Sequence, residues 1–361
     1  MLTLGNSKWK SLLTKETKMM FEGLRPPLRR RMPLTVTGVF LALLLAPVPS
    51  TAAPQSDKDL AQQIFDTMVQ LPGNKPGYRL IHAKGIVCQG TFAATKEAAK
   101  LSRAEHFRGA TVPVTVRFSE APPDPAISDV SPDAAPWGMA IRFKLSGGKE
   151  TDIVSSSHNG FFVGTGEDVL AFQKAKVATD RTKPHPWPIE VFLSTHPRAL
   201  KFVKDPKPVP VSFATQAFYG DNTFRFVNEK GLKQAVRYQI LPVAGQHYLT
   251  EAEAKAKSPN FLFEELRTHL AQEPAKFRLL VQLPNSGDPT DDASVAWPDD
   301  RKTVDLGTIT ITSVVADSDA AQKALAFDPT QLTDGIELSD DPLPALRSSV
   351  SMLSRMHRQG Q

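Results

Sequence analysis

Residues 112–119 alternate regularly between apolar and polar side chains. Val112, Val114, Val116 and Phe118 occupy one set of alternate positions, and Thr115, Arg117 and Ser119 occupy the other. Because side chains of a strand point to opposite faces in turn, this pattern predicts a half-buried β-strand.

Further strands are predicted wherever short apolar stretches are bounded by proline, glycine or polar clusters. The stretch 304–315 changes its apolar face near Gly307, which predicts a β-bulge. The other predicted strands are 78–92, 138–145, 152–154, 224–228, 235–242 and 277–283.

Apolar residues at helical spacing predict several helices between these strands. Ser56 and Thr165 each precede an acidic residue by three positions, as helix N-caps do. The predicted helices are 60–70, 94–103, 165–177, 258–270 and 341–356, with a short one near 189–192. Strands in series with helices gathered at the ends predict an α+β fold, in which an antiparallel sheet closes into a β-barrel with surrounding helices.

The first 53 residues have the pattern of an export signal. Arg29–Arg31 precede an apolar run from Leu34 to Ala46, and the small residues Ser50–Ala53 follow. A basic segment, a short apolar segment and a small-residue cleavage site are typical of a secretory signal peptide. We therefore expect 1–53 to be a signal peptide with an N-terminal extension, cleaved near Ala52–Ala53, and 54–361 to be a single domain without a membrane span.

The basic charge of the chain belongs to this segment. Residues 1–53 contain eight basic and two acidic side chains, whereas the whole chain has a net charge of only +5. The remainder is therefore close to neutral, and its charge gives no support for nucleic-acid binding. Cys88 is the only cysteine in the sequence, so an intramolecular disulfide is excluded.

His82 stands out because it falls on the apolar side of the predicted strand 78–92. A histidine in such a place is either a core residue with a satisfied hydrogen bond or a working group held away from water. Arg79, Arg117, Ser119 and Arg347 are polar residues that bear on this choice. Two arginines near a histidine could hold a carboxylate-bearing ligand, and a serine could orient the imidazole, although arginines on strands are often simply solvated.

Four motifs in order resemble the haem catalases, most closely the small, exported catalase-related peroxidases. They are R-x-x-H-A-K-G (79–85), V-R-F-S (116–119), G-M-A-I-R-F (138–143) and F-D-P…D-G-I-E-x-S-D-D-P…R (327–347). The resemblance covers residues 57–358. It implies a catalase-type antiparallel β-barrel that holds a buried, non-covalent haem b.

The resemblance also implies roles for individual residues. His82 would stand over the iron and move a proton between the two peroxide oxygens, and Ser119 would fix its tautomer. Arg79 and Arg117 would pair with the haem propionates. Phe161 would pack on the porphyrin, and Arg347 would hydrogen-bond the axial ligand.

The sequence departs from the family pattern at that axial ligand. The family has a tyrosine four residues after the arginine, whereas this chain has Ser351. A serine hydroxyl is a poor iron ligand, so Ser351 only marks the axial position.

Two functions follow as expectations. The first is a haem-dependent peroxidase that reduces organic peroxides, with hydrogen peroxide as a further candidate substrate, in the periplasm as part of the response to oxidative stress. Its partners would be the peroxide and an electron donor that the sequence does not identify. The second is a catalase-like pseudoenzyme that binds haem weakly, or another apolar ligand, without turnover.

Overall fold

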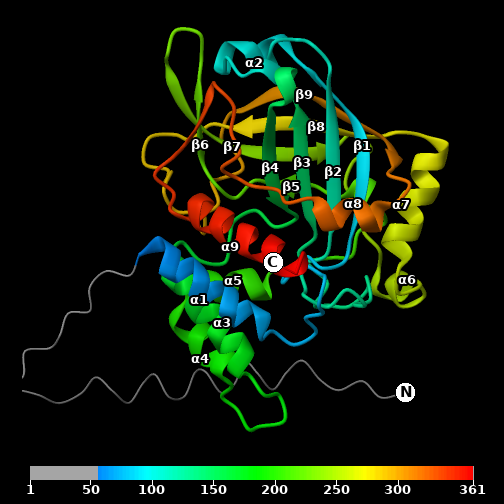
Figure 1. The fold of residues 1–361 in the computed structure, drawn as a ribbon, viewed down its shortest axis with the longest axis vertical. Helices are drawn as coiled ribbons and strands as arrows, with labels where there is room; N and C mark the ends of the chain where they lie inside the picture. Colours follow the sequence, from blue (N-terminus) through cyan, green and yellow to red (C-terminus); the bar gives the residue numbers. More distant parts are fainter. Residues whose placement is uncertain (1–55, 361) are drawn as a thin grey trace, which may run out of the picture. The chain divides into compact units, whose positions relative to one another are not determined.

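The structure is a computed structural model that describes residues 56–360. Within this range, eight antiparallel strands close into a barrel (Figure 1). The barrel strands are β1 (Gly85–Ala94), β2 (Val112–Ser119), β3 (Gly138–Lys144), β4 (Glu150–Ser156), β5 (Phe218–Tyr219), β7 (Lys233–Pro242), β8 (Ala275–Gln282) and β9 (Thr303–Val314). Each of these strands pairs with the next, and β9 pairs with β1 to complete the ring.

Two shorter strands continue the sheet outside the ring. β6 (Phe224–Val227) pairs with β7, and β10 (Ile336–Leu338) pairs with β6. The barrel interior is filled by side chains of the alternating kind predicted for 112–119, including Val114, Val116 and Phe118, which are all buried. The predicted α+β fold with a closed antiparallel barrel is therefore confirmed.

The predicted bulge near Gly307 is also confirmed. Leu279 lies opposite Gly307 while Leu280 lies opposite Asp305, so β9 holds one extra residue at this point. An extra residue moves the following side chains to the other face of the strand, as the sequence pattern requires.

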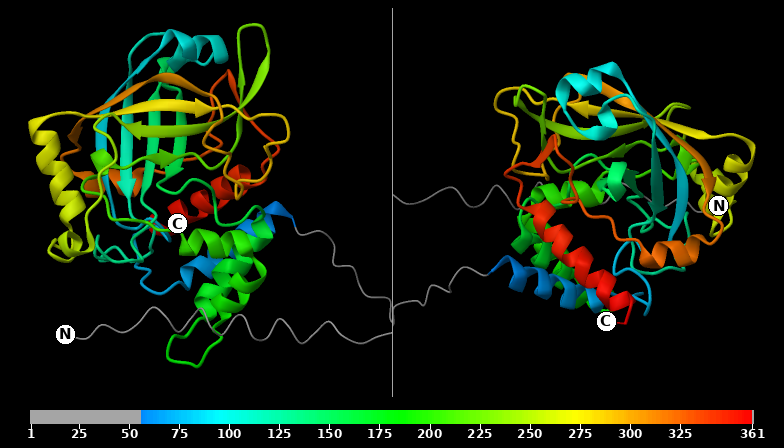
Figure 2. Two further views of the ribbon diagram at one scale, coloured as in Figure 1. Left: turned by 180° about the vertical axis from the view of Figure 1, so that it is seen from behind. Right: turned by 45° about the horizontal axis from the view of Figure 1, so that its top comes forward.

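The helices gather largely below one end of the barrel (Figures 1 and 2). α9 runs across this end, and the α1 residues Leu60 and Ile64 share an apolar cluster with Leu343 and Leu346 of α9. The helices are α1 (Asp57–Val69), α2 (Lys96–Leu101), α3 (Gly166–Ala178), α4 (Pro188–Thr195), α5 (Pro197–Lys204), α6 (Glu251–Lys255), α7 (Phe261–Gln272), α8 (Ser318–Ala324) and α9 (Leu343–Arg358).

Both predicted helix caps are present. The hydroxyl of Ser56 accepts a hydrogen bond from the backbone of Asp59 at 3.3 Å, and that of Thr165 accepts one from Asp168 at 3.2 Å. None of the helices in 56–360 has the length and apolar composition that crossing a membrane requires. The expected signal segment, 1–53, lies outside the described residues.

The prediction of one strand over 78–92 is wrong at its start. β1 begins at Gly85, and His82 has a φ of 56°, in the left-handed region. The backbone N–H groups of His82 and Ala83 donate to the carbonyls of Ala121 and Pro122, so this segment still runs beside the chain that leaves β2. A left-handed residue breaks the two-residue repeat, and His82 therefore does not share the face of Ile86 and Cys88.

Candidate functional site

His82 and Ser119 meet where the segment before β1 passes the end of β2. Nδ1 of His82 lies 3.1 Å from the hydroxyl oxygen of Ser119. A histidine in the left-handed region is uncommon and carries a conformational cost of about 1 kcal/mol or more. A strained backbone conformation persists only where the surrounding structure holds the residue in place, and such residues are common at functional sites.

Gly138, at the start of β3, makes room for this pair. A Cβ atom on Gly138 would lie 2.8 Å from the Ser119 hydroxyl oxygen and 3.2 Å from two atoms of the His82 ring. Any other residue would therefore push the imidazole or the hydroxyl out of place. The motif that contains Gly138 thus packs directly against the candidate site.

The charge state of His82 is set by burial and by its neighbours. Burial, and then the positive charges of Arg117, Arg347 and Arg79, lower its pKa from 6.5 to about 3, against a smaller opposing effect of a hydrogen bond to the Glu120 backbone. The ring is neutral at physiological pH. A neutral imidazole can accept a proton from one group and return it to another.

Arg117 is held against the backbone of the His82 segment. Its Nη2 donates to the carbonyl of His82 at 2.8 Å, and Nη2 and Nε donate to the side-chain oxygen of Gln322 on α8 at 2.9 and 3.2 Å. Gly85 is needed for this approach, because a Cβ atom there would lie within the guanidinium. Burial, and then the charge of Arg358, lower the pKa of Arg117 to about 9.

Arg79 and Arg358 meet at the carbonyl of Leu325. Arg79 donates to it at 2.7 Å and Arg358 at 2.6 Å. Burial lowers the pKa of Arg79, and the charges of Arg117 and Arg358 lower it further. Within 56–360, no carboxylate forms an ion pair with these three arginines, which rest on neutral acceptors only.

Arg347 and Phe161 lie together on the helical side of the site. The guanidinium of Arg347 stands over the Phe161 ring, 5.3 Å from its centre, and donates to the side-chain oxygen of Asn222. Burial lowers the pKa of Arg347, while Asp221 and Asp341 act in the opposite direction. Arg347 therefore adds to the positive field that reaches His82.

Ser351, four residues further along α9, makes a different kind of contact. Its hydroxyl donates to the carbonyl of Phe327 at 3.4 Å, a long hydrogen bond. The described part of α9 offers no tyrosine or cysteine. Its His357 is exposed on a neighbouring helix face, where the ring contacts Phe65.

The residues present fit part of the haem that the resemblance implies. The guanidiniums of Arg79, Arg117 and Arg358, which pair with no carboxylate of the described residues, match the propionates, and the neutral His82 matches the peroxide-binding face. Ser351 is a poor match for the axial ligand, because a serine hydroxyl binds iron poorly and this one is directed to Phe327. Within 56–360, no cluster of three His, Cys, Asp or Glu side chains offers an alternative metal site.

Sequence reasoning missed several residues of this site. Arg358 follows Arg347 by eleven positions, three turns along α9, so helical spacing alone could have placed both on one face. Gln322 and Asn222, which hold Arg117 and Arg347, carry no local signal. Their contacts join segments that are far apart in the sequence.

Comparisons with known proteins agree with the fold and the motifs. A sequence model of the family described as Catalase matches residues 59–361. A catalase-related peroxidase of Mycolicibacterium paratuberculosis is 36% identical over 309 residues, covering 82% of this chain and 94% of that protein. One from Synechococcus elongatus is 32% identical and covers 82% of this chain and 88% of that protein.

Larger catalases are similar over part of their length. The catalase of Soldanella alpina is 28% identical, and this chain covers 60% of it. A crystal structure of a fungal catalase superposes with a TM-score of 0.70 at 20% identity, covering 79% of this chain and 60% of that chain. At this identity the structural likeness supports the fold alone.

Proposed function

Because the chain belongs to the catalase family, we propose that it is a haem-dependent peroxidase that reduces organic peroxides and also acts on hydrogen peroxide. The observation that carries this proposal is the neutral His82, held by Ser119 beside three arginines that have no carboxylate partner within 56–360. The printed names of the bacterial relatives, both catalase-related peroxidases, support the same reaction class.

The residues that would hold the cofactor follow from the charges. Arg79, Arg117 and Arg358 would face the two carboxylates of a haem b, and Phe161 and Arg347 would lie on its helical side. Bound haem would supply the redox-active iron at which the peroxide O–O bond is reduced. Forming these ion pairs would compensate guanidiniums that burial and mutual repulsion now destabilise.

His82 would handle the proton. When Nδ1–H donates to the Ser119 hydroxyl oxygen, Nε2 carries no hydrogen and would take the proton from the inner peroxide oxygen and return it to the outer one. The leaving group then departs as an alcohol or water instead of an alkoxide or hydroxide, which is the benefit of general acid–base catalysis. The complete reaction consumes two electrons and two protons per peroxide, supplied by a donor.

The test is peroxide-dependent dye oxidation by the protein loaded with hemin. We expect His82→Gln to lower kcat/KM by about a hundredfold or more, the usual contribution of a general acid–base residue. The matched control is His247→Gln, at an exposed site, which should leave the rate unchanged. Equal rates for wild type and His82→Gln would contradict the assigned role.

Ser351 favours a second candidate, a catalase-like pseudoenzyme that binds haem weakly or another apolar ligand without turnover. An axial phenolate stabilises oxidised iron, and the hydroxyl of Ser351 is instead directed to Phe327. The same assay separates the two. A protein that takes up hemin and oxidises no dye with either alkyl or hydrogen peroxide is the pseudoenzyme.

We also propose that the protein acts in the periplasm after cleavage near Ala52–Ala53. The sequence pattern of residues 1–53 supports this, as described above. Expression of the full chain in a Gram-negative host, followed by osmotic-shock fractionation and intact mass measurement, tests it. Full-length protein in the cytoplasmic fraction would argue against export.

A further inference from the structure

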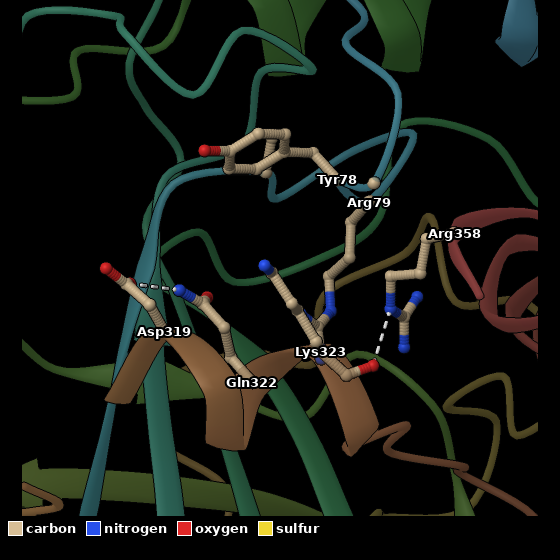
Figure 3. A pocket seen from close by; sticks show the side chains of 8 residues that line it. Tyr78, Arg79, Asp319, Gln322, Lys323 and Arg358 are labelled. Carbon is tan, nitrogen blue, oxygen red and sulfur yellow. Dashed lines mark hydrogen bonds between the residues drawn. The ribbon is translucent and has the colours of Figure 1, made fainter. Parts of the chain in front are cut away.

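A small cavity lies beside Ala83, the residue that follows His82. It has a volume of about 150 Å³, and Figure 3 shows the side chains that line it. Pockets for drug-sized ligands begin at roughly 300 Å³, so a whole porphyrin is too large for this space but a small organic acid is not. The labelled lining residues are Tyr78, Arg79, Asp319, Gln322, Lys323 and Arg358.

Three of these residues are cations that come from separate segments. Arg79 precedes β1, Lys323 belongs to α8, and Arg358 ends α9 (Figure 3). The one carboxylate of the lining, Asp319, accepts a hydrogen bond from the Gln322 amide at 2.9 Å. Among the described residues it forms no ion pair with any of the three cations, so the cavity has a net positive charge.

The arginines of this cavity gain little from the protein itself. Burial, and then the charge of Arg355, lower the pKa of Arg358 to about 10. Arg79 and Arg358 both donate to the carbonyl of Leu325, and Arg358 also donates to the carbonyl of Lys323 at 3.1 Å (Figure 3). Two guanidiniums whose acceptors among the described residues are neutral backbone carbonyls, beside a solvent-exposed lysine, form a surface that favours a carboxylate.

The positive charge exceeds what the proposed cofactor needs. Arg79, Arg117, Arg358 and Lys323 carry four positive charges, whereas two haem carboxylates and Asp319 would carry three negative ones. Lys323 is the exposed member and is not among the residues that would hold haem. The one positive charge in excess therefore belongs to Lys323, on the exposed side of the cavity.

We propose that this cavity binds a small carboxylate- or enediolate-bearing reductant, which is the electron donor of the peroxidase. This inference rests on the proposed function, because the bound acid would give its electrons to the peroxide reaction. Each turnover would remove two electrons and two protons from the donor and convert the peroxide ROOH into ROH and water. Lys323, which is not among the residues that would hold haem, would recognise its negative charge.

Isothermal titration calorimetry with ascorbate, as an anionic enediol, tests the site in protein with and without hemin. We expect binding that weakens as salt is added. Lys323→Gln should weaken it by about three- to fivefold, the effect of losing one partly exposed charge contact. Lys323→Glu should weaken it further, and the control Lys276→Gln, at an exposed position on β8, should not.

Steady-state turnover gives a second readout in the hemin-loaded protein. Lys323→Glu should raise KM for ascorbate and leave turnover with guaiacol, an uncharged donor, unchanged. Equal effects of substitution at Lys323 and Lys276, or loss of ascorbate binding once hemin is bound, would overturn the inference. Failure of hemin uptake would refute the proposed function, and with it the donor role, while calorimetry of the haem-free protein would still report on the anion site.

Discussion

At the scale of single residues, the site depends on two glycines, whose missing side chains leave room for its polar groups. Gly138 and Gly85 let the His82 ring and the Arg117 guanidinium occupy space that a Cβ atom would take. The backbone of His82 is left-handed, and its ring touches Ser119. These close approaches hold a neutral imidazole in a positively charged environment.

The low pKa of His82 predicts how activity depends on acidity. A general base works in its neutral form, which is present above its pKa of about 3. Lowering the pH from 8 to 5 should therefore cause no loss of kcat/KM attributable to protonation of His82. An acid limb with a midpoint near 6.5 in hemin-loaded protein, with the fold verified by circular dichroism, would show that the imidazole is not shielded as described.

The sequence indicated these residues only in part. The alternating pattern predicted that His82 lies on the apolar face of a strand, because a predicted strand is assumed to continue until glycine or proline interrupts it. The left-handed turn at His82 is imposed by pairing with residues 121–122, which lie about forty positions away. Such a tertiary contact has no local signature.

At the scale of elements, some residues of the four motifs belong to the candidate site and others stabilise the fold around it. Arg142 of β3 makes two hydrogen bonds to the buried Asp152 of β4, at 2.8 and 2.6 Å, and a third to the carbonyl of Ala326. Asp152 also accepts the backbone N–H of Asp328. This network fastens the F-D-P segment to the barrel, on the path that leads to α9.

Breaking this network should destabilise the fold. Arg142→Met would leave the Asp152 carboxylate buried without its partner, so we expect the free energy of unfolding to fall by about 3 kcal/mol. Urea denaturation measures it. Arg278→Met is the matched control: its pair with Asp305 is exposed, and we expect a loss below about 1 kcal/mol. Similar losses for both substitutions would refute the structural role of Arg142.

Helices and long strands were predictable because their periodic patterns are strong. The smallest elements were not: β5 has two residues and β10 has three, too short for any alternation to register. α5, α6 and α8 were also missed. α8 matters most for function, because Gln322 and Lys323 come from it.

At the scale of the whole described domain, barrel closure brings the site together. The segment before β1, the end of β2 and the start of β3 are neighbours in the sheet, and α9 crosses the same end of the barrel. The sequence predicted a closed sheet, but the pairing of β1 with β9 that closes it joins segments far apart in the sequence, which hydrophobic periodicity does not encode. The small relatives match over nearly their whole length, whereas the plant and fungal catalases extend beyond this domain.

The proposed function requires that Arg79, Arg117, Arg358 and His82 together accommodate a haem. Titration of the purified protein with hemin, followed by the Soret band, tests this most directly. The account predicts saturable uptake of one hemin per chain with a shifted Soret band, and weaker uptake when Arg79 and Arg117 are both replaced by methionine in protein that remains folded. A spectrum that stays that of free hemin throughout the titration would contradict the account.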